Sequence, residues 1–585
     1  MWGERAMTWQ ASRTMISHAS RLRYMQPLRA SSYPATVAIP PVWVTSDAGP
    51  IILSTMSWFV RATGVLACLL ALSGCARPGP APDGSLRLAD AVDIRTLDTA
   101  IGYDASSWRF ERLINDGLLN FAPTDSTLVP AVAEALPEIE EGRRFTFRLR
   151  DNVYFHHGRQ VVAEDFRYSL TRILDPQTAS PGRSLYEGIV GARAFGKGEA
   201  GTVAGLQCPD ELTFVVELES PDLAFLNLMA LPFAYAVPRE EVERYSASDW
   251  PGHAVGCGPY RLDVWEPGVR IRVGRFDRYY DPSRGILPAI EMRFGVADYL
   301  QLMMFERGEI DVTGVPLTDL ERIDGDARLK SYMRTSADLT TAYASFNTEQ
   351  SPFDNRAVRQ AFNYALNRDR LVQLYAGTIR AARGVLPPGM PGYNPDLRSY
   401  THDPAKAREL LASAGFRDNL QVELTTRDRP AERRLGEAIQ SDLRDVGVSV
   451  AVRAVSFPVW LELVNRHEGL PFTINNWIAD YPDPSNFLDV LLNGRHVEYA
   501  GSSNRSFYNN PQVNDLLDRA AVMTDAAARL KLYQAAEQII VDDAPWLFLY
   551  HPTRMVLVQP WLQNYHLHPV WTSREDLIWI EEVAQ

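Results

Sequence analysis

A strand, a helix and a second strand follow one another directly in residues 420–456, and this order constrains the fold more than any other feature of the chain. The run LQVELTT alternates apolar and polar residues, PAERRLGEAIQSDLRDVG has a helical pattern, and VSVAVRAVS is rich in valine. Two such strands pair in parallel through a right-handed crossover. The fold class is therefore expected to be α/β, with a sheet that contains parallel strands.

Capping residues predict two further helices. The segment FDNRAVRQAFNYALNRDRLVQLYAG is expected to form one helix that begins at the N-cap Asp354 and ends before Gly377. The segment HDPAKARELLASAGF has Asp403 as its N-cap, Pro404 at the first helical position and Gly415 just past its end. Longer helices of this kind alternate with single strands after about residue 336.

The earlier part of the chain has a different pattern. Residues 145–149 alternate as a strand does, and the helix that follows carries Phe166, Leu170 and Ile173 on one side. Residues 208–282 mostly have the pattern of short strands separated by Gly and Pro turns. A chain of 585 residues with 46% apolar residues is long enough to fill the cores of two or more domains of about 150 residues each.

Composition and charge argue against two kinds of partner. The formal net charge is -13 and the isoelectric point is near 5.4, so the chain has no general attraction to phosphate backbones, and nucleic acid is not expected to bind. After residue 75 no stretch of eighteen or more apolar residues occurs, so the body of the protein is not expected to span a membrane.

The N-terminal region has the pattern of an export signal. From Met56, MSWFVRATGVLACLLALSGCA has one positive charge, an apolar run and the sequence LSGC, and it resembles a bacterial lipoprotein signal peptide. The resemblance implies cleavage before Cys75, a lipid on its sulfur, and a tether over residues 76–85. The alternative is an ordinary secretory signal in which Cys75 is incidental. Residues 1–55 are expected to be a spurious or disordered extension, with Met56 as the true start.

Export places the remaining cysteines in an oxidising compartment. Cys68 leaves with the signal, so Cys208 and Cys257 are a candidate disulfide pair. The alternative is two free thiols, because sequence does not show whether their Cα atoms come within bridging distance.

Charged residues follow two of the predicted strands. Arg427 and Arg429 come after LQVELTT, and Asp480 comes after FTINNW. Ligands of open α/β sheets bind beyond the carboxyl ends of the strands. A cation and an anion at one edge suit a zwitterion such as a short peptide. The alternative is that these residues are solvated loop charges.

Six segments carry a resemblance to a known family and occur in the family's order. They are LVPAVAEALPEIEEGRRFTFRLRDNVYFHHGRQVVAEDFRYSL, VGCGPYRLDVWEPG, FNTEQSPFDNRAVRQAFNYALNRDRLV, YTHDPAKARELLASAGF, WIADYPDPSNFL and DDAP. From about Leu86 to the C-terminus, the chain resembles the peptide and nickel family of extracellular solute-binding proteins, family 5. This family serves ATP-driven importers and includes the oligopeptide- and dipeptide-binding proteins.

The resemblance implies a two-lobe periplasmic-binding-protein fold of class II, with mixed sheets. The first lobe is expected to contain an extra subdomain, and two crossovers near residues 336–346 and 548–555 are expected to form a hinge. Ligand binding would close the lobes around a cleft. The expected boundaries are 86–338 for lobe I, with the subdomain at about 120–250, then 339–551 for lobe II and 552–585 for a return to lobe I.

The resemblance also assigns the WIADYPDP segment to the ligand site. It implies that Asp480 accepts hydrogen bonds from the free α-amino group of a peptide, because a buried ammonium needs an anionic partner. The residues Asn476, Trp477 and Ile478 would line the first residues of that peptide.

Dipeptide binders of the family hold the ligand's C-terminal carboxylate with an arginine just after the strand that matches LQVELTT. Arg429 matches that position, and Arg427 competes for the role. The expected partners are a peptide, the permease subunits of an ABC importer and, through the lipid anchor, a membrane. The chain is expected to be a monomer without cofactor or catalytic activity, in the periplasm or on the outer side of the cytoplasmic membrane.

Other ligands and roles stay open. An oligosaccharide, an opine or a nickel chelate would suit the same fold, since the fold does not fix the ligand. His566 and His568 are spaced to face one side of a strand and could chelate a metal, although no third ligand is near in sequence. A sensor or a chaperone-like peptide binder is the alternative outside transport.

Overall fold

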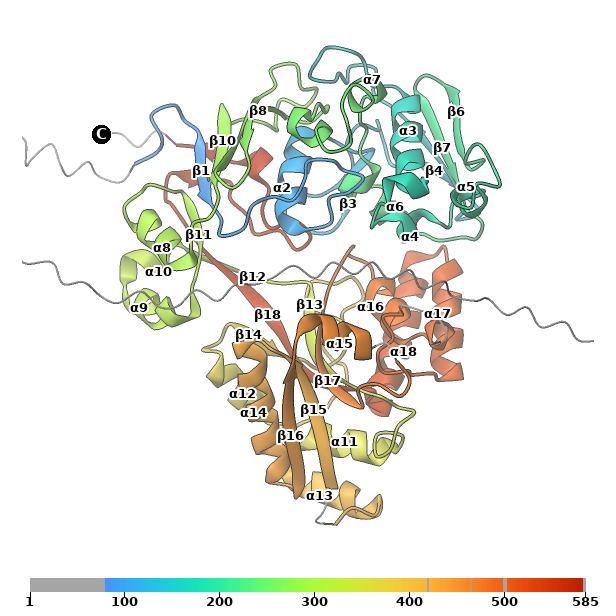
Figure 1. Cartoon of the computed structure of the whole chain (residues 1–585), viewed down its shortest axis with the longest axis vertical. Coiled ribbons are helices and arrows are strands. Elements are labelled where there is room, and N and C mark those ends of the chain that lie inside the picture. The colour runs from blue at the N-terminus through green and yellow to red at the C-terminus, as the bar shows by residue number, and fades with distance from the viewer. Residues whose placement is uncertain (1–78, 418–419, 465, 498–501, 582–585) are drawn as a thin grey trace, which may run out of the picture. The chain divides into compact units, whose positions relative to one another are not determined.

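The computed structural model describes residues 79–417, 420–464, 466–497 and 502–581, which belong to the unit Arg77–Gln585 (Figure 1). The expected extension over residues 1–55, the signal peptide and the lipidated Cys75 lie outside the described residues. Within the described ranges, no helix combines the length and the apolar character that crossing a membrane requires.

The strands of the described residues form several sheets. One sheet has the order β1 (Leu86–Ala89), β10 (Ala289–Arg293), β9 (Arg270–Arg275) and β8 (Tyr260–Glu266). A second has the order β4 (Glu138–Glu140), β5 (Arg144–Arg148), β7 (Thr213–Glu217) and β6 (Leu206–Asp210). The largest has the order β11 (Val312–Gly314), β18 (Trp546–Val558), β13 (Thr340–Phe346), β17 (Phe472–Ile478), β15 (Leu420–Arg427) and β16 (Val448–Val455), with β12 (Met333–Ala337) and β14 (Ile379–Ala381) also on β18. The short pairs are β2 (Leu119–Phe121) with β3 (Leu128–Pro130) and β19 (Leu562–Gln563) with β20 (Trp579–Ile580).

The helices fall into two groups along the chain. Before the crossover they are α2 (Ala105–Ile114), α3 (Ala163–Leu174), α4 (Arg183–Tyr186), α5 (Ala192–Gly196), α6 (Phe225–Leu228), α7 (Arg239–Val242), α8 (Asp298–Glu306), α9 (Leu320–Gly325) and α10 (Ala327–Tyr332). After it they are α11 (Arg356–Ala365), α12 (Arg368–Leu374), α13 (Pro404–Ser413), α14 (Pro430–Arg444), α15 (Phe457–Val464), α16 (Ser485–Leu492), α17 (Pro511–Val522) and α18 (Ala526–Asp543).

The predicted strand–helix–strand unit is confirmed. β15 and β16 pair in parallel over their whole length, with α14 between them in sequence. β17 continues the sheet beside β15 and is antiparallel to β13. The sheet is therefore mixed. Apolar side chains of α11, α13 and α14, such as Phe362, Leu411 and Ile439, pack in one core with Phe472 of β17.

The prediction of one continuous helix over residues 354–377 is wrong, because two separate helices occur there. α11 starts after Asn355, not Asp354, and the Asn355 side chain accepts a hydrogen bond from the amide of Ala357. The chain then leaves the helical conformation at Leu366, and Asn367 caps the separate helix α12. The predicted caps of α13 are confirmed, since Asp403 accepts a hydrogen bond from the amide of Lys406.

The long strand β18 connects two sets of hydrophobic cores. Its first half pairs with β13, and Leu547 and Leu549 pack in the core that contains Phe472. Its second half pairs with β12 and β11, and Val556 and Val558 pack with the sheet of β1. Figure 1 shows β18 (red) running between these two groups of elements. The chain is thus a mixed α/β protein with the two-lobe fold.

The C-terminal residues return to the elements at the start of the chain. Arg112 of α2 forms an ion pair with Glu575 at 3.0 Å, and Arg284 pairs with Asp576 at 2.7 Å. All four side chains are buried. Removing one partner of such a pair would leave an unpaired buried charge, so each of these residues depends on its partner across the two segments.

The candidate disulfide is not present, and Cys208 and Cys257 are free thiols. Buried Cys257 has its Sγ atom 3.8 Å from the carbonyl oxygen of Asp116, whereas Cys208 lies on β6 beside Glu164. The two sulfurs thus have different neighbours. Burial raises the pKa of Cys208 to about 11 and also raises the pKa of Cys257, which favours the protonated form of both thiols.

Candidate ligand-binding cleft

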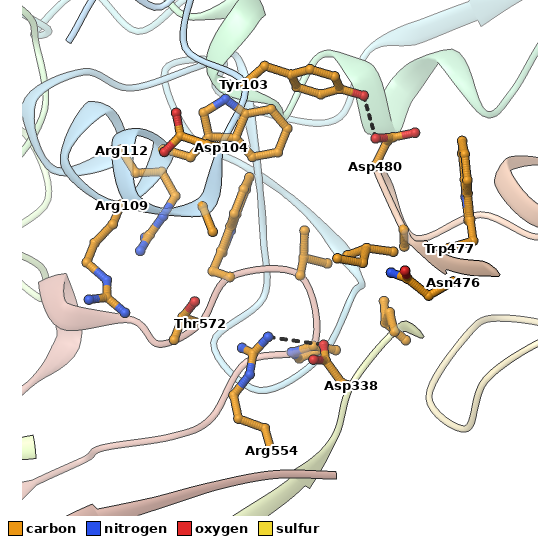
Figure 2. Close-up of a pocket in the computed structure, with 18 of the residues that line it drawn as sticks. Tyr103, Asp104, Arg109, Arg112, Asp338, Asn476, Trp477, Asp480, Arg554 and Thr572 are labelled. Atoms are coloured by element: carbon orange, nitrogen blue, oxygen red, sulfur yellow. Dashed lines mark hydrogen bonds and ion pairs between the residues drawn. The ribbon is translucent and has the colours of Figure 1, made fainter. Parts of the chain in front are cut away.

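A cavity of about 580 Å³ lies where the loop before α2, the end of β17 and the C-terminal return meet (Figure 2). This volume suits a ligand of a few residues, because pockets for small ligands span about 300 to 1,000 Å³. Its lining is Tyr103, Asp104, Ala105, Trp108, Arg109, Arg112, Asp338, Leu339, Arg427, Phe457, Trp460, Leu461, Asn476, Trp477, Ile478, Ala479, Asp480, Arg505, Arg554, Pro569, Val570, Trp571 and Thr572.

Asp480 lies just beyond the end of β17, and its carboxylate faces the cavity (Figure 2). Oδ2 accepts a hydrogen bond from Nδ2 of Asn486 on α16 at 3.1 Å, and Oδ1 accepts one from the hydroxyl of Tyr103 at 2.5 Å. No Lys, Arg or His of the described residues lies within 4.0 Å of the carboxylate. Burial raises the pKa of Asp480, and the two hydrogen bonds oppose that effect.

Asn486 fixes the whole end of β17. Its Oδ1 atom accepts hydrogen bonds from the amide of Asp480 and from Nε1 of Trp477, both at 3.0 Å. β17 ends at Ile478, four residues before Pro482. Asn476, Trp477 and Ile478 line the cavity together with Asp480, and Ile478 is 61% exposed. The structure therefore brings these four predicted residues together.

The second aspartate of the same segment has a different role. Asp483 is buried and forms a two-pronged ion pair with Arg529 of α18 at 2.6 and 2.9 Å. Asp480 and Asp483 thus differ in what neutralises them. Asp483 has a protein cation, whereas Asp480 has only uncharged donors among the described residues.

The two candidate arginines at the end of β15 differ in whether they line the cavity. Arg427 lines the cavity and contacts Glu432 at 2.6 Å and Asn476 at 2.9 Å. Arg429 is exposed at the start of α14 and does not line the cavity. Arg427 is the last residue of β15, and Arg429 lies two residues beyond the strand. Of the two predicted residues, Arg427 lies in the cavity lining and Arg429 does not.

Helix α15 supplies an apolar wall that the sequence interpretation missed. Phe457, Trp460 and Leu461 line the cavity, and Phe457 and Leu461 remain 48% and 44% exposed. The segment FPVWLELV is apolar around most of the helix, whereas a surface helix needs only one apolar face. The additional apolar residues were the feature of the sequence from which this wall could have been predicted.

Arginine and tryptophan side chains of α2 and of the C-terminal return form the opposite wall, and these were also missed. Trp108 and Trp571 meet edge to face with centroids 6.1 Å apart, and the guanidinium of Arg112 lies 5.2 Å from the Trp571 ring. Arg109 and Arg112 both pair with Glu575. Trp108 and Trp571 are 463 positions apart in the chain, so no local pattern links them.

The crossing strands contribute one ion pair to the cavity. Asp338 and Arg554 lie 3.0 Å apart and both line the cavity (Figure 2). Asp338 lies between β12 and β13, and Arg554 is on β18. This pair therefore spans the two segments that were predicted to form the hinge.

His566 and His568 both form hydrogen bonds with protein atoms. Nε2 of His568 bonds the carbonyl oxygen of Ala122, and Nδ1 accepts hydrogen bonds from the amides of Val570 and Trp571. His566 bonds Asn564 instead. Burial lowers the pKa of His568 to about 4. Within the described ranges, no group of three or more His, Cys, Asp and Glu side chains is arranged to hold a metal ion.

Comparisons with known proteins identify the family. The family described as "Bacterial extracellular solute-binding proteins, family 5 Middle" matches residues 127–499. The chain is 27% identical over 467 residues to the glutathione-binding protein GsiB of Escherichia coli O1:K1 / APEC, covering 79% of this chain and 87% of the relative. It is 27% identical over 491 residues to heme-binding protein A of Haemophilus influenzae, covering 80% of this chain and 86% of the relative.

A solved structure also shares the fold. The unliganded open form of the periplasmic murein tripeptide binding protein MppA superposes with a TM-score of 0.76 and 26% identity, covering 86% of this chain and 98% of that chain. These relatives are named as binding proteins. Since the family match spans more than half of the 585 residues, the chain belongs to the bacterial extracellular solute-binding proteins of family 5.

Proposed function

We propose that this protein is the substrate-binding component of an ABC importer, and that it captures short peptides in the cleft and delivers them to the permease. The observation that carries this proposal is Asp480, a carboxylate that faces the cavity without a cationic partner among the described residues. Burying a carboxylate away from a cation is unfavourable, and a ligand cation would remove that penalty.

The α-amino group of a peptide fits the Asp480 position chemically. An ammonium group offers three donors, and hydrogen bonds between charged groups are about twice as strong as those between neutral groups. It would take the place of the Tyr103 hydroxyl at Oδ1, while Asn486 keeps its hold on Oδ2. The strand end would therefore not need to move.

The rest of the cleft suits the peptide's side chains. The walls present Trp108, Trp477, Phe457 and Leu461 to the cavity, and apolar walls accept side chains of varied shape. Two relatives support a peptide ligand, since one is named for glutathione and another for a murein tripeptide. Both compounds carry an amine and carboxylates.

The predicted domain boundaries and anchor are part of this proposal. Lobe I would comprise residues 86–338 with its extra subdomain at about 120–250, lobe II residues 339–551, and the return segment 552–585. The lobes would close on the ligand by rotation about the crossing strands. The closed form would then dock on the permease. Cys75 would carry a lipid that holds a monomeric protein to the membrane on its periplasmic side.

Heme is the competing ligand, because one relative is named as a heme-binding protein and the cleft contains aromatic and arginine side chains. Thermal unfolding of the purified protein with trialanine, N-acetyl-trialanine or heme separates these ligands. A ligand that binds only the folded state at a hundred times its Kd adds about 2.7 kcal/mol of stability. Stabilisation by trialanine alone supports peptide capture, and stabilisation by heme alone contradicts it.

A further inference from the structure

A second cavity lies among the described residues, away from the ligand cleft. Its volume is about 420 Å³. The strand pair β2–β3, the loop between β9 and β10 and the C-terminal return meet around it. None of the residues that line it also lines the cleft. The second cavity is therefore a separate candidate site.

Three arginines line the second cavity. They are Arg150, Arg284 and Arg574, and the side chains of the last two are only 8% and 4% exposed. Among the described residues, the only acidic side chain of the lining is Asp281. Its Oδ1 atom accepts hydrogen bonds from the amide and the hydroxyl of Ser283. The lining thus carries a net positive charge.

Two of the arginines are neutralised by buried carboxylates that lie outside the lining. Arg284 donates hydrogen bonds to Asp576 at 2.7 Å and to Asp116 at 2.8 Å. Arg574 donates two hydrogen bonds to Asp576, at 2.9 and 2.8 Å. Burial opposes the ionisation of Asp576, but the two arginines outweigh it and hold its pKa well below the ordinary value. Both carboxylates therefore serve Arg284 and Arg574.

The third arginine has no such partner. The Nε atom of Arg150 donates a hydrogen bond to the carbonyl oxygen of Ala131 at 2.8 Å, and its guanidinium carbon lies 5.6 Å from the centroid of the Tyr280 ring. No carboxylate of the described residues lies within 4.0 Å of the Arg150 guanidinium. One positive charge of the lining is left without a protein counterion.

The second cavity also has hydrogen-bond donors to spare. A guanidinium group carries five N–H donors. With acceptors among the described residues, Arg574 uses three of them, Arg284 two and Arg150 one. Asn120 also lines the cavity, and only its Oδ1 atom is bonded there, to the amide of Phe121. The lining therefore suits an anion with several oxygen atoms.

A phosphate group matches this arrangement better than a carboxylate does. A carboxylate has two oxygens in one plane and pairs with one guanidinium fork, whereas the phosphate of a monoester has three acceptor oxygens and a charge of about -1.5 to -2 at pH 7. Several guanidinium groups around one space suit the second geometry. Apolar residues such as Val129, Pro130 and Leu577 line the rest of the second cavity and would contact the organic part of the ester.

We propose that the second cavity binds the phosphate group of a small phosphate monoester, and that Arg150 supplies the positive charge that this phosphate neutralises. The inference does not depend on what the cleft binds. A bound phosphate would connect positions 150, 284 and 574, which are far apart in the chain, and would stabilise the attachment of the C-terminal return.

The phosphate group could come from a free ester or from a phospholipid headgroup, and two measurements separate these sources. Isothermal titration calorimetry uses glycerol phosphate and inorganic phosphate, with acetate as the carboxylate probe. Cosedimentation compares vesicles of phosphatidylglycerol with vesicles of phosphatidylcholine. Binding of glycerol phosphate that depends on Arg150 supports the proposal with a free ester. Binding only to phosphatidylglycerol vesicles, again dependent on Arg150, supports it with a lipid headgroup.

The variants Arg150→Gln and Arg150→Lys test the residue. Arg150→Gln should weaken the binding of glycerol phosphate by about 10-fold or more, the loss expected for hydrogen bonds to a charged group. Arg150→Lys should bind with intermediate affinity, because lysine keeps the charge but not the planar fork. Arg148→Gln is the matched control, since Arg148 is exposed on β5 and does not line the second cavity, and it should bind as the wild type does.

Thermal unfolding at constant ionic strength provides a second readout. Glycerol phosphate should raise the midpoint of the wild type and of Arg148→Gln, and it should not raise that of Arg150→Gln. Midpoints of the unliganded variants within a few degrees of the wild type exclude misfolding as the cause.

Three results would overturn the inference and leave the proposed function of the cleft untouched. The first is equal affinity of the wild type and Arg150→Gln for glycerol phosphate and for phosphatidylglycerol vesicles. The second is no binding of the wild type to any of the phosphate probes. The third is binding of acetate as tight as that of glycerol phosphate, which would contradict selection of a phosphate group.

Discussion

The hydroxyl of Tyr103 donates a hydrogen bond of 2.5 Å to Oδ1 of Asp480, although the two residues are 377 positions apart in the chain. Tyr103 precedes α2, and Asp480 lies just beyond the end of β17. The contact joins the two walls of the cavity at the position where we expect the ligand's amine (Figure 2).

The first prediction concerns the variant Tyr103→Phe. If a ligand ammonium displaces the hydroxyl, removing the hydroxyl spares the free energy of breaking its bond, which is about 0.5 to 1.5 kcal/mol. The affinity for trialanine should therefore rise by roughly 2- to 10-fold. N-acetyl-trialanine should show no gain. Calorimetric titration measures both, and weaker trialanine binding by Tyr103→Phe would show that Tyr103 holds the ligand instead.

The second prediction concerns pH. Burial raises the pKa of Asp480 above its ordinary value of 3.8, so the free carboxyl takes up a proton at a higher pH than an exposed aspartate does. An ammonium ligand needs the ionised form. Peptide affinity should thus be constant near neutral pH and should fall as the pH drops toward that raised pKa. Affinity measured from pH 7 to pH 4 tests this, and the Asp480→Asn variant should show a flat profile.

The raised pKa of Asp480 also makes the stability of the unliganded protein depend on pH, and this stability changes with pH in the opposite direction to peptide affinity. A carboxyl whose folded pKa is raised binds its proton more tightly in the folded state than in the unfolded state. Its contribution to stability is present at low pH and is lost as the pH rises through the folded pKa. Bound peptide should reverse this, because an ammonium partner stabilises the ionised form.

The third prediction concerns a buried acid away from the cleft. Glu537 on α18 accepts hydrogen bonds from the amides of Val385 and Leu386 through Oε1, while Oε2 is buried without a partner. Burial raises the pKa of Glu537 from 4.5 to about 7. Between these two values its contribution to the free energy of unfolding should fall by roughly 3 kcal/mol as the pH rises.

The variant Glu537→Gln keeps an acceptor for the two amides and cannot ionise. Its stability should equal that of the wild type near pH 4.5 and exceed it above pH 7. Urea unfolding at several pH values gives both curves. Parallel curves for the two proteins would show that Glu537 does not titrate in this range.

Local structure was largely predictable from the sequence, because local signals determine it. The crossover unit and the caps of α13 followed from hydrophobic period and capping residues. The break between α11 and α12 was missed, since an apolar stripe continues across it and only the Asn367 cap marks it. The sequence could not show whether Cys208 and Cys257 form a disulfide, because a disulfide depends on the distance between their Cα atoms, which their separation in the sequence does not determine.

The candidate site was predictable only where one segment carries it. Asp480 and its neighbours lie within five positions, so a single motif identified them. Tyr103, Trp571 and Arg505 reach the same cavity from distant parts of the chain. Arg427 and Arg429 differ by two positions, and only the end of β15 shows which of them faces the cavity.

The central claim is that Asp480 binds the free amino group of a peptide, and calorimetric titration of trialanine and N-acetyl-trialanine into the wild type and Asp480→Asn tests it most directly. Removing one partner of a buried charge pair costs about 3 to 5 kcal/mol, so Asp480→Asn should bind trialanine at least about 100-fold more weakly. The acetylated peptide should bind both proteins equally weakly. The Asp483→Asn variant is the contrasting control, since that residue pairs with Arg529 and its loss should lower stability rather than select against the free amine. Equal trialanine affinity in the wild type and Asp480→Asn would contradict the account.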